Sequence, residues 1–153
     1  MKKITSTILL LFVTFSFSQI KKAEEKSVLI GEAKNIGVKI ASMYKVPGDP
    51  DYYFITYDNL KFTQITDVKS FGFKDIDNAF DYLYTSIVDG FKNKEKEIEL
   101  ELEDGLLTIE YAMGSIRFVF ISNAGVSSFS GYITKKQFST LFGKKYNKAD
   151  FKK

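Results

Sequence analysis

The side chains that could perform chemistry in this chain of 153 residues are carboxylates, hydroxyls and lysine amines, because the sequence contains neither histidine nor cysteine. Without an imidazole, the chain lacks the usual general base near neutral pH and every Ser–His or Cys–His nucleophile pair. Zinc, copper and iron sites lose almost all of their protein ligands for the same reason. We therefore expect a protein that is not an enzyme, with no catalytic residue, no metal site and no cofactor.

Two acidic segments remain as candidates for a cation site. One is a row of alternating glutamates on a predicted strand: Glu97, Glu99, Glu101 and Glu103. Alternate residues on a strand lie about 6.5 to 7 Å apart, so these carboxylates form a line rather than a cage. The other, residues 75–78, partly matches a calcium loop, but Ala79 and Phe80 occupy the positions where a ligand and a glycine are expected. We interpret the first as a solvated strand face and the second as acids at a helix N-terminus.

The candidate binding site is a group of tyrosines around a turn at residues 47–51. Its members are Tyr44, Tyr52, Tyr53 and Tyr57. Tyrosines beside a loop can bind glycans, peptides or another protein, although packing in the core or across strands is the simpler interpretation. Both faces of the segment 52–57 are largely non-polar, and one long helix can cover only one of them. The other face would then be a binding surface, a dimer contact or an apolar pocket.

Extended segments and two helices must position these residues. Strands are expected at residues 27–33, 36–46, 52–57 and 60–73, with a two-residue turn at 58–59. Apolar residues then recur every three or four positions from 76 to 91, which predicts a helix of about four turns with Asp75 as its N-cap. Near the C-terminus, Thr134 and Gln137 form a capping box for a short helix that Gly143 ends.

Residues 97–122 predict a three-stranded meander, with turns at residues 104–105 and 113–114. The first turn pairs Leu102 with Leu107, Leu100 with Ile109 and Ile98 with Tyr111, and the second pairs Tyr111 with Ile116, Ile109 with Phe118 and Leu107 with Phe120. The same register places Glu110 opposite Arg117. Both turns put apolar side chains on one face, which a slip of one residue would destroy. A last strand is expected at residues 126–132.

This order of elements predicts an α+β domain. We expect a mostly antiparallel sheet of six to eight strands, with one long helix packed on it and a short C-terminal helix. A duplicated, saddle-like sheet is one alternative, because each half has roughly four strands followed by a helix. A rolled seven-stranded barrel of pleckstrin-homology type is another.

The N-terminus has the pattern of a secretory signal peptide. Lys2 and Lys3 precede a short apolar run at residues 8–17, and Ser16 and Ser18 supply small residues before a cut between Ser18 and Gln19. The run is shorter than the roughly 20 apolar residues that span a bilayer. We therefore expect a secreted or periplasmic protein divided into a signal peptide (1–18), a flexible lead-in (19–26), a single domain (27–143) and a basic flexible tail (144–153).

The charge of the mature chain argues against nucleic acid as a partner. Removal of the signal peptide takes away Lys2 and Lys3 and no acid, so the formal net charge falls from +3 to +1. Arg117 is the single arginine, whereas arginine is the usual bidentate reader of phosphate and guanine. Because the chain has no cysteine, it cannot carry a lipid on an N-terminal cysteine, and we expect no membrane anchor after cleavage.

Three segments together resemble a group of uncharacterised small exported proteins of the Bacteroidetes. These are the serine- and phenylalanine-rich leader that ends before Gln19, the stretch 59–67, and the ending 134–143. The resemblance spans most of the mature chain and implies a Gram-negative envelope, but it implies no activity.

Two functions fit these expectations. The first is a non-enzymatic binding module that engages a protein or a glycan through an aromatic sheet face. The second is a carrier of an apolar small molecule held between the long helix and a curved sheet. The carrier requires a cavity of several hundred Å³ lined by Phe80, Leu83, Ile87 and strand residues.

Overall fold

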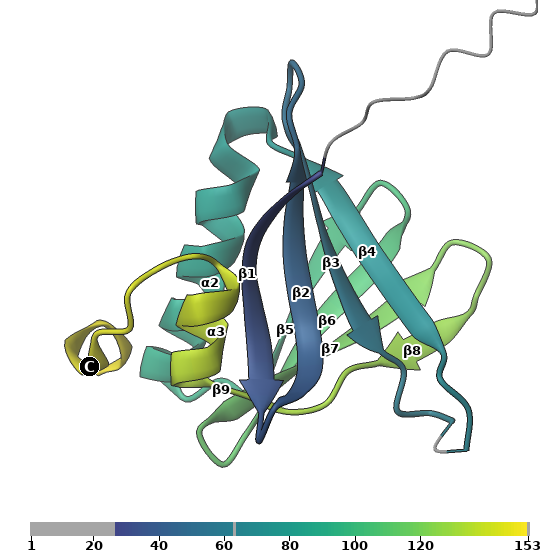
Figure 1. The fold of residues 1–153 in the computed structure, drawn as a ribbon. Helices are drawn as coiled ribbons and strands as arrows, with labels where there is room; N and C mark the ends of the chain where they lie inside the picture. The colour runs from purple at the N-terminus through teal and green to yellow at the C-terminus, as the bar shows by residue number, and fades with distance from the viewer. Residues whose placement is uncertain (1–26, 63, 153) are drawn as a thin grey trace, which may run out of the picture.

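The computed structural model describes residues 27–62 and 64–152, which form an α+β fold (Figure 1). The predicted signal peptide (1–18) and lead-in (19–26) lie outside the described residues. The expected antiparallel α+β class, with one long helix and a short C-terminal helix, is confirmed. The described strands divide into two separate sheets rather than one.

The first sheet is an antiparallel meander in the order β1-β2-β3-β4. Its strands are β1 (Val28–Asn35), β2 (Val38–Val46), β3 (Tyr52–Asp58) and β4 (Val68–Lys74). The expected two-residue turn at 58–59 is not formed, because a longer loop follows β3. Asn59 holds this loop by donating through Nδ2 to Asp67 Oδ2 at 2.8 Å and by accepting through Oδ1 from the amide of Phe129 at 3.2 Å.

The second sheet has the order β5-β6-β7-β8, with β9 also paired to β7. Its strands are β5 (Glu97–Leu102), β6 (Gly105–Ala112), β7 (Ser115–Ser122), β8 (Ser127–Phe129) and β9 (Ile133–Thr134). The predicted β6–β7 register is confirmed, including Glu110 opposite Arg117. The predicted β5–β6 register is wrong by two residues, because Leu102 pairs with Gly105 and the turn consists of Glu103 and Asp104. A shift of two keeps each side chain on its predicted face.

Two helices fill the space at one end of the two sheets. A 3₁₀ turn (Ile76–Asn78) precedes α2 (Ala79–Asn93), and α3 (Lys135–Leu141) follows β9. Asp75, the predicted N-cap, precedes the 3₁₀ turn, and the N-cap of α2 is Asn78; the Asp75 carboxylate still accepts the amide of Phe80 in the first turn of α2 at 3.0 Å. The predicted capping box of α3 is confirmed, and Gly143 adopts the left-handed φ of +65° that ends a helix.

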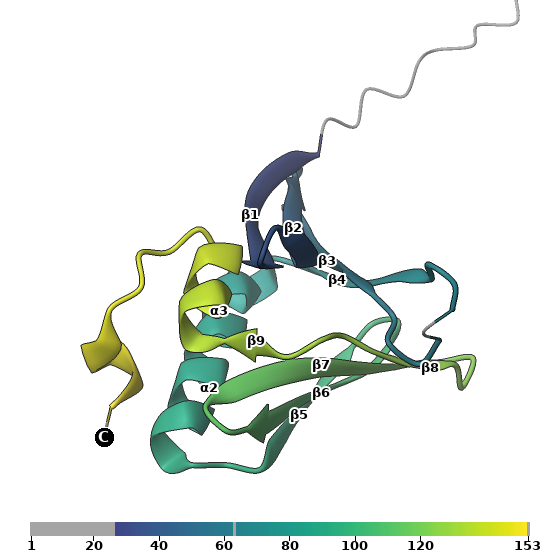
Figure 2. The same cartoon turned by 60° about the horizontal axis from the view of Figure 1, so that its bottom comes forward.

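The two sheets form the sides of a wedge, with the helices at its wide end (Figure 2). At the narrow end, the ring of Phe71 on β4 lies 5.4 Å from Phe118 and 5.8 Å from Phe120 on β7. At the wide end, Phe80 of α2 lies 5.4 Å from Phe142, next to the end of α3. The chain passes from β4 to β5 through α2, and these two strands belong to different sheets and do not pair with each other.

The segment after α3 is packed onto the domain, which corrects the expectation of a flexible tail at residues 144–153. A 3₁₀ turn (Lys148–Phe151) places Phe151 in the core with 4% of its surface exposed. Its ring lies 5.5 Å from Phe91 of α2 and 5.7 Å from Tyr146. The sequence expectation followed the lysines of this segment and gave too little weight to its two aromatic residues.

Helix α2 packs closely against the second sheet at Gly90. A Cβ at this position would lie 2.1 Å from the hydroxyl oxygen of Tyr111, which itself donates to the carbonyl of Ile87 at 3.0 Å. Gly90→Ala should therefore destabilise the protein by about 1 to 3 kcal/mol, although the same change stabilises an open helix. Urea unfolding measures the difference, with Asn93→Ala on the exposed side of α2 as the control. A Gly90→Ala protein more stable than the parent would contradict this packing.

Candidate binding site

The four candidate tyrosines do not form one surface, because they lie on opposite faces of the first sheet. Tyr53 and Tyr57 point into the core, with 8% and 2% of their surfaces exposed. The hydroxyl of Tyr57 lies 2.8 Å from Ser128 Oγ on β8, so it joins the two sheets, and burial raises its pKa. The sequence pattern placed Tyr52 on one face of β3 and Tyr53 and Tyr57 on the other, but it could not decide which face is internal.

Tyr44 and Tyr52 lie on the outer face of this sheet, which none of the described helices crosses (Figure 1). Their rings stack on Phe54, with centroids 5.1 Å and 6.3 Å apart. Phe54 therefore has a ring on each side, and the group lacks the open aromatic platform that a sugar ring would stack on. Burial raises the pKa of Tyr52, and the negative charges of Asp104 and Glu103 raise it further. Lys74, which pairs with Tyr52 across β3 and β4, donates to Glu103 at 3.0 Å, so this part of the sheet borders the acidic turn between β5 and β6.

The turn beside these tyrosines is held by Asp51. Its carboxylate accepts from the amide of Gly48 at 3.0 Å and forms an ion pair with Lys45 at 2.5 Å. The hydrogen bond from Lys45 and then that from Gly48 lower the pKa of Asp51. Asp51 is thus a structural residue of the turn, in agreement with the interpretation of this segment as a turn.

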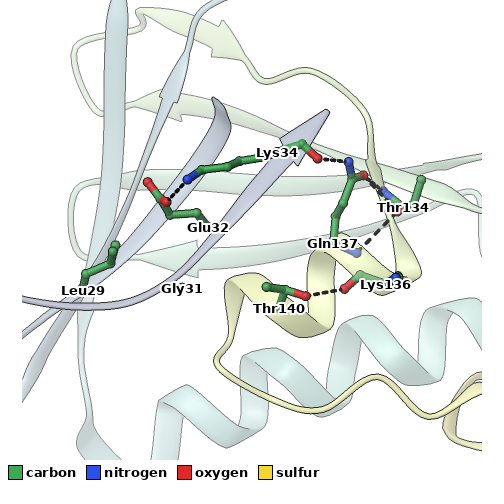
Figure 3. Close-up of a pocket in the computed structure, with 8 residues that line it drawn as sticks. All are labelled: Leu29, Gly31, Glu32, Lys34, Thr134, Lys136, Gln137 and Thr140. Atoms are coloured by element: carbon green, nitrogen blue, oxygen red, sulfur yellow. Dashed lines mark hydrogen bonds and ion pairs between the residues drawn. The ribbon is translucent and has the colours of Figure 1, made fainter. Parts of the chain in front are cut away.

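A hollow of about 650 Å³ lies between β1 and α3 (Figure 3). It is lined mainly by polar side chains, including Glu32 and Lys34, which form an ion pair. Gln137 Nε2 donates to the backbone carbonyl of Lys34 at 2.5 Å, and a Cβ at Gly31 would lie 2.0 Å from the carbonyl oxygen of Thr140. Helix α3 therefore covers the outer edge of β1, and we interpret this hollow as part of that contact.

A second groove, of about 490 Å³, lies between the start of α2 and β5. Most of its lining is apolar and comes from β4, the 3₁₀ turn before α2, α2 itself and β5: Phe73, Ile76, Ala79, Tyr82, Leu83, Leu100 and Leu102. The remaining lining residues are charged: Lys74, Glu99, Glu101 and Glu103. Of the residues expected to line a carrier cavity, Leu83 lines this groove, whereas Phe80 and Ile87 pack within the core.

The outer edge of β5 is open within the described part of the chain, because β5 pairs only with β6. The amide of Tyr111 donates to the carbonyl of Lys96 at 2.9 Å, which identifies Lys96 and Tyr111 as a hydrogen-bonded pair. Alternation along an antiparallel ladder then points the amides and carbonyls of Glu97, Glu99 and Glu101 away from β6. The backbone of two groove residues, Glu99 and Glu101, thus has free hydrogen-bonding groups on the groove side.

Sequence reasoning missed this groove, although one signal for it was present. The alternation of glutamate and leucine was correctly interpreted as a half-buried strand, and this strand follows a helix rather than a hairpin turn. A strand reached through a helix need not pair with the strand before it. Which residues lie beside the unpaired edge of β5 depends on how β4 and α2 fold.

Comparison with known proteins gave no match: no family model matches the chain, and no curated protein or solved structure matches it. The resemblance to small exported proteins of the Bacteroidetes therefore stays a prediction. Within residues 27–62 and 64–152, no cluster of three or more acidic residues could hold a metal ion. Over the same ranges, no helix is long and apolar enough to span a membrane.

The different environments of the tyrosines predict different effects of removing their hydroxyls. Tyr57→Phe deletes a buried hydrogen bond to Ser128 and should lower the free energy of unfolding by about 1 kcal/mol. Tyr44→Phe is the matched control, and its effect should stay within about 0.5 kcal/mol, because Tyr44 lies on the partly exposed outer face of the first sheet. Urea denaturation compares the two, and equal losses would argue against the assigned faces.

Proposed function

We propose that this chain is an exported, non-enzymatic binding module that holds an extended segment of another protein in the groove between α2 and β5. The observation that carries this proposal is the position of the free β5 edge along an apolar groove. An added strand gains main-chain hydrogen bonds from such an edge, and pockets beside the edge select alternate side chains of the segment. The geometry provides both features at one place.

The acceptor strand is already ordered by the protein, so binding would not require it to fold. Leu100 and Leu102 of β5 are half-buried and pack against the core. Lys74 at the end of β4 donates to Glu103 at 3.0 Å, which ties the groove's two sides together. A preformed strand loses little conformational entropy when a segment pairs with it.

An apolar small molecule is the second candidate occupant. The observation in its favour is that side chains of α2, β4 and β5 converge on one apolar-lined volume of about 490 Å³, a size within the range of ligand pockets. Such a ligand would use the side chains of the groove and not the backbone of β5. The two candidates can therefore be separated by changing that backbone alone.

Export and the absence of catalysis are parts of the same proposal. Support for export comes from the order of lysines, apolar run and small residues in positions 1–18. Support for a binding role comes from a sequence without histidine or cysteine, in which neither of the usual nucleophile pairs can be formed.

Replacing Glu99 with proline tests strand addition. The change removes an outward-pointing amide and should leave the β5–β6 ladder in place, because proline is tolerated where an edge-strand amide faces solvent. Glu99→Gln is the matched control, since it loses the charge and keeps the amide. We expect Glu99→Pro to weaken binding of a short synthetic peptide of alternating leucine and threonine at least about tenfold, and Glu99→Gln to leave it nearly unchanged. Fluorescence anisotropy with labelled peptide measures both.

A third variant, Ile76→Ser, tests whether the groove holds an apolar small molecule instead of a peptide segment. Ile76→Ser reduces the apolar lining at an exposed position, so the protein should fold normally while either type of occupant binds less well. Decanoate, measured by calorimetry, serves as the apolar probe. Decanoate binding that Ile76→Ser weakens and Glu99→Pro does not, together with no peptide binding by the parent protein, would replace the proposed function with that of a carrier.

A further inference from the structure

We infer that the segment held at β5 alternates lysine or arginine with apolar residues. This inference rests on the proposed function, because it describes the side chains of a strand placed beside β5. Side chains of an added strand would alternate between two environments. One set would enter the apolar groove, and the other would lie beside the outward-facing glutamates of β5.

The glutamates of β5 have no cationic neighbours on the strand that they pair with. Glu99 lies opposite Thr108, and Glu101 lies opposite Leu106. Within residues 27–62 and 64–152, neither carboxylate forms an ion pair with a lysine or arginine. The open side of β5 is therefore the remaining position from which a cross-strand cation could reach them.

Glu97 continues this pattern at the start of the strand. It lies opposite Glu110, whose carboxylate is already bound by the guanidinium of Arg117. Arg117 thus relieves the like-charge pair from the β6 side, and within the described residues no lysine or arginine forms an ion pair with Glu97. A row of three exposed carboxylates faces the open edge, at the usual spacing of alternate strand residues.

The groove beside β5 also carries a net negative charge. Its charged lining consists of three carboxylates, Glu99, Glu101 and Glu103, and one ammonium, that of Lys74. Lys74 is itself engaged by Glu103. Cross-strand neighbours lie about 4.5 to 5.5 Å apart at their Cβ atoms, so lysine or arginine on an added strand could pair with Glu99 and Glu101 directly.

The same charges disfavour a second copy of this chain as the occupant. Pairing β5 with β5 of another copy would place the glutamate rows side by side, and like charges in opposed positions are destabilising. Charged residues on an edge strand are a common protection against such self-pairing. The edge therefore selects against its own sequence and in favour of a segment with cations at alternate positions.

Four synthetic peptides of equal length test this inference with the full chain as receptor. In three of them, leucine alternates with lysine, with threonine or with glutamate. The fourth has the lysine–leucine composition with all leucines in one block. We expect the alternating lysine peptide to bind about tenfold more tightly than the threonine peptide at physiological salt, and the glutamate peptide to bind most weakly. The advantage of lysine should shrink as salt is raised.

The double variant Glu99→Gln/Glu101→Gln supplies the matched receptor. It should lose the preference for lysine and keep the affinity for the threonine peptide, because both side chains are exposed and their backbone groups are unchanged. If the lysine, threonine and glutamate peptides bind equally well, the inference fails while strand addition stands. If the block peptide binds as tightly as the alternating lysine peptide, the groove does not select alternate side chains, and both the inference and the proposed function fail. If no alternating peptide binds, the proposed function itself fails.

Discussion

Among the described residues, the backbone of β5 is hydrogen-bonded to a neighbouring strand on one side only, and the proposed binding depends on this open side. Every buried amide and carbonyl needs a partner, and a sheet edge must be paired, covered or left in water. The outer edge of β1 is covered by α3, through Gln137 and the close contact at Gly31. The edge of β5 has an apolar groove beside it instead. The outer edges of β1 and β5 are thus treated differently, and within the described residues that of β5 is left open to a partner.

Aromatic packing fixes the geometry of that groove. Phe71 on β4 contacts Phe118 and Phe120 on β7, which sets the narrow end of the wedge. At the wide end, α2 is held against the second sheet at Gly90, where the ring of Tyr111 leaves no room for a Cβ. These contacts fix the positions of β4 and α2, which both contribute to the lining of the groove opposite β5. A dense core of this kind changes shape little when a ligand binds.

Local patterns in the sequence predicted much of the fold. The 3.6-residue period gave α2, the capping box gave α3, and the β6–β7 register followed from matching apolar faces across a glycine turn. The β5–β6 turn was misplaced by two residues, because both registers put leucines on one face and local pattern cannot separate them.

What the sequence could not provide was the relation between its two halves. Tyr44 and Tyr53 look alike in the sequence, yet one stacks on the surface and the other is buried, because the second sheet covers only one face of the first. The groove likewise results from the packing of the two halves of the chain against each other. Its residues come from segments as far apart as Phe73 and Leu102, and only the packing of α2 between the sheets brings them together.

Amide hydrogen exchange, read residue by residue by NMR, tests the central claim most directly. In the free protein, the amides of Glu99 and Glu101 should exchange rapidly, whereas those of Ile98 and Leu100, which point to β6, should be protected. Saturating peptide of alternating lysine and leucine should slow exchange at Glu99 and Glu101. Protection of these two amides in the free protein, or exchange that bound peptide leaves unchanged, would contradict an open edge that binds by strand addition.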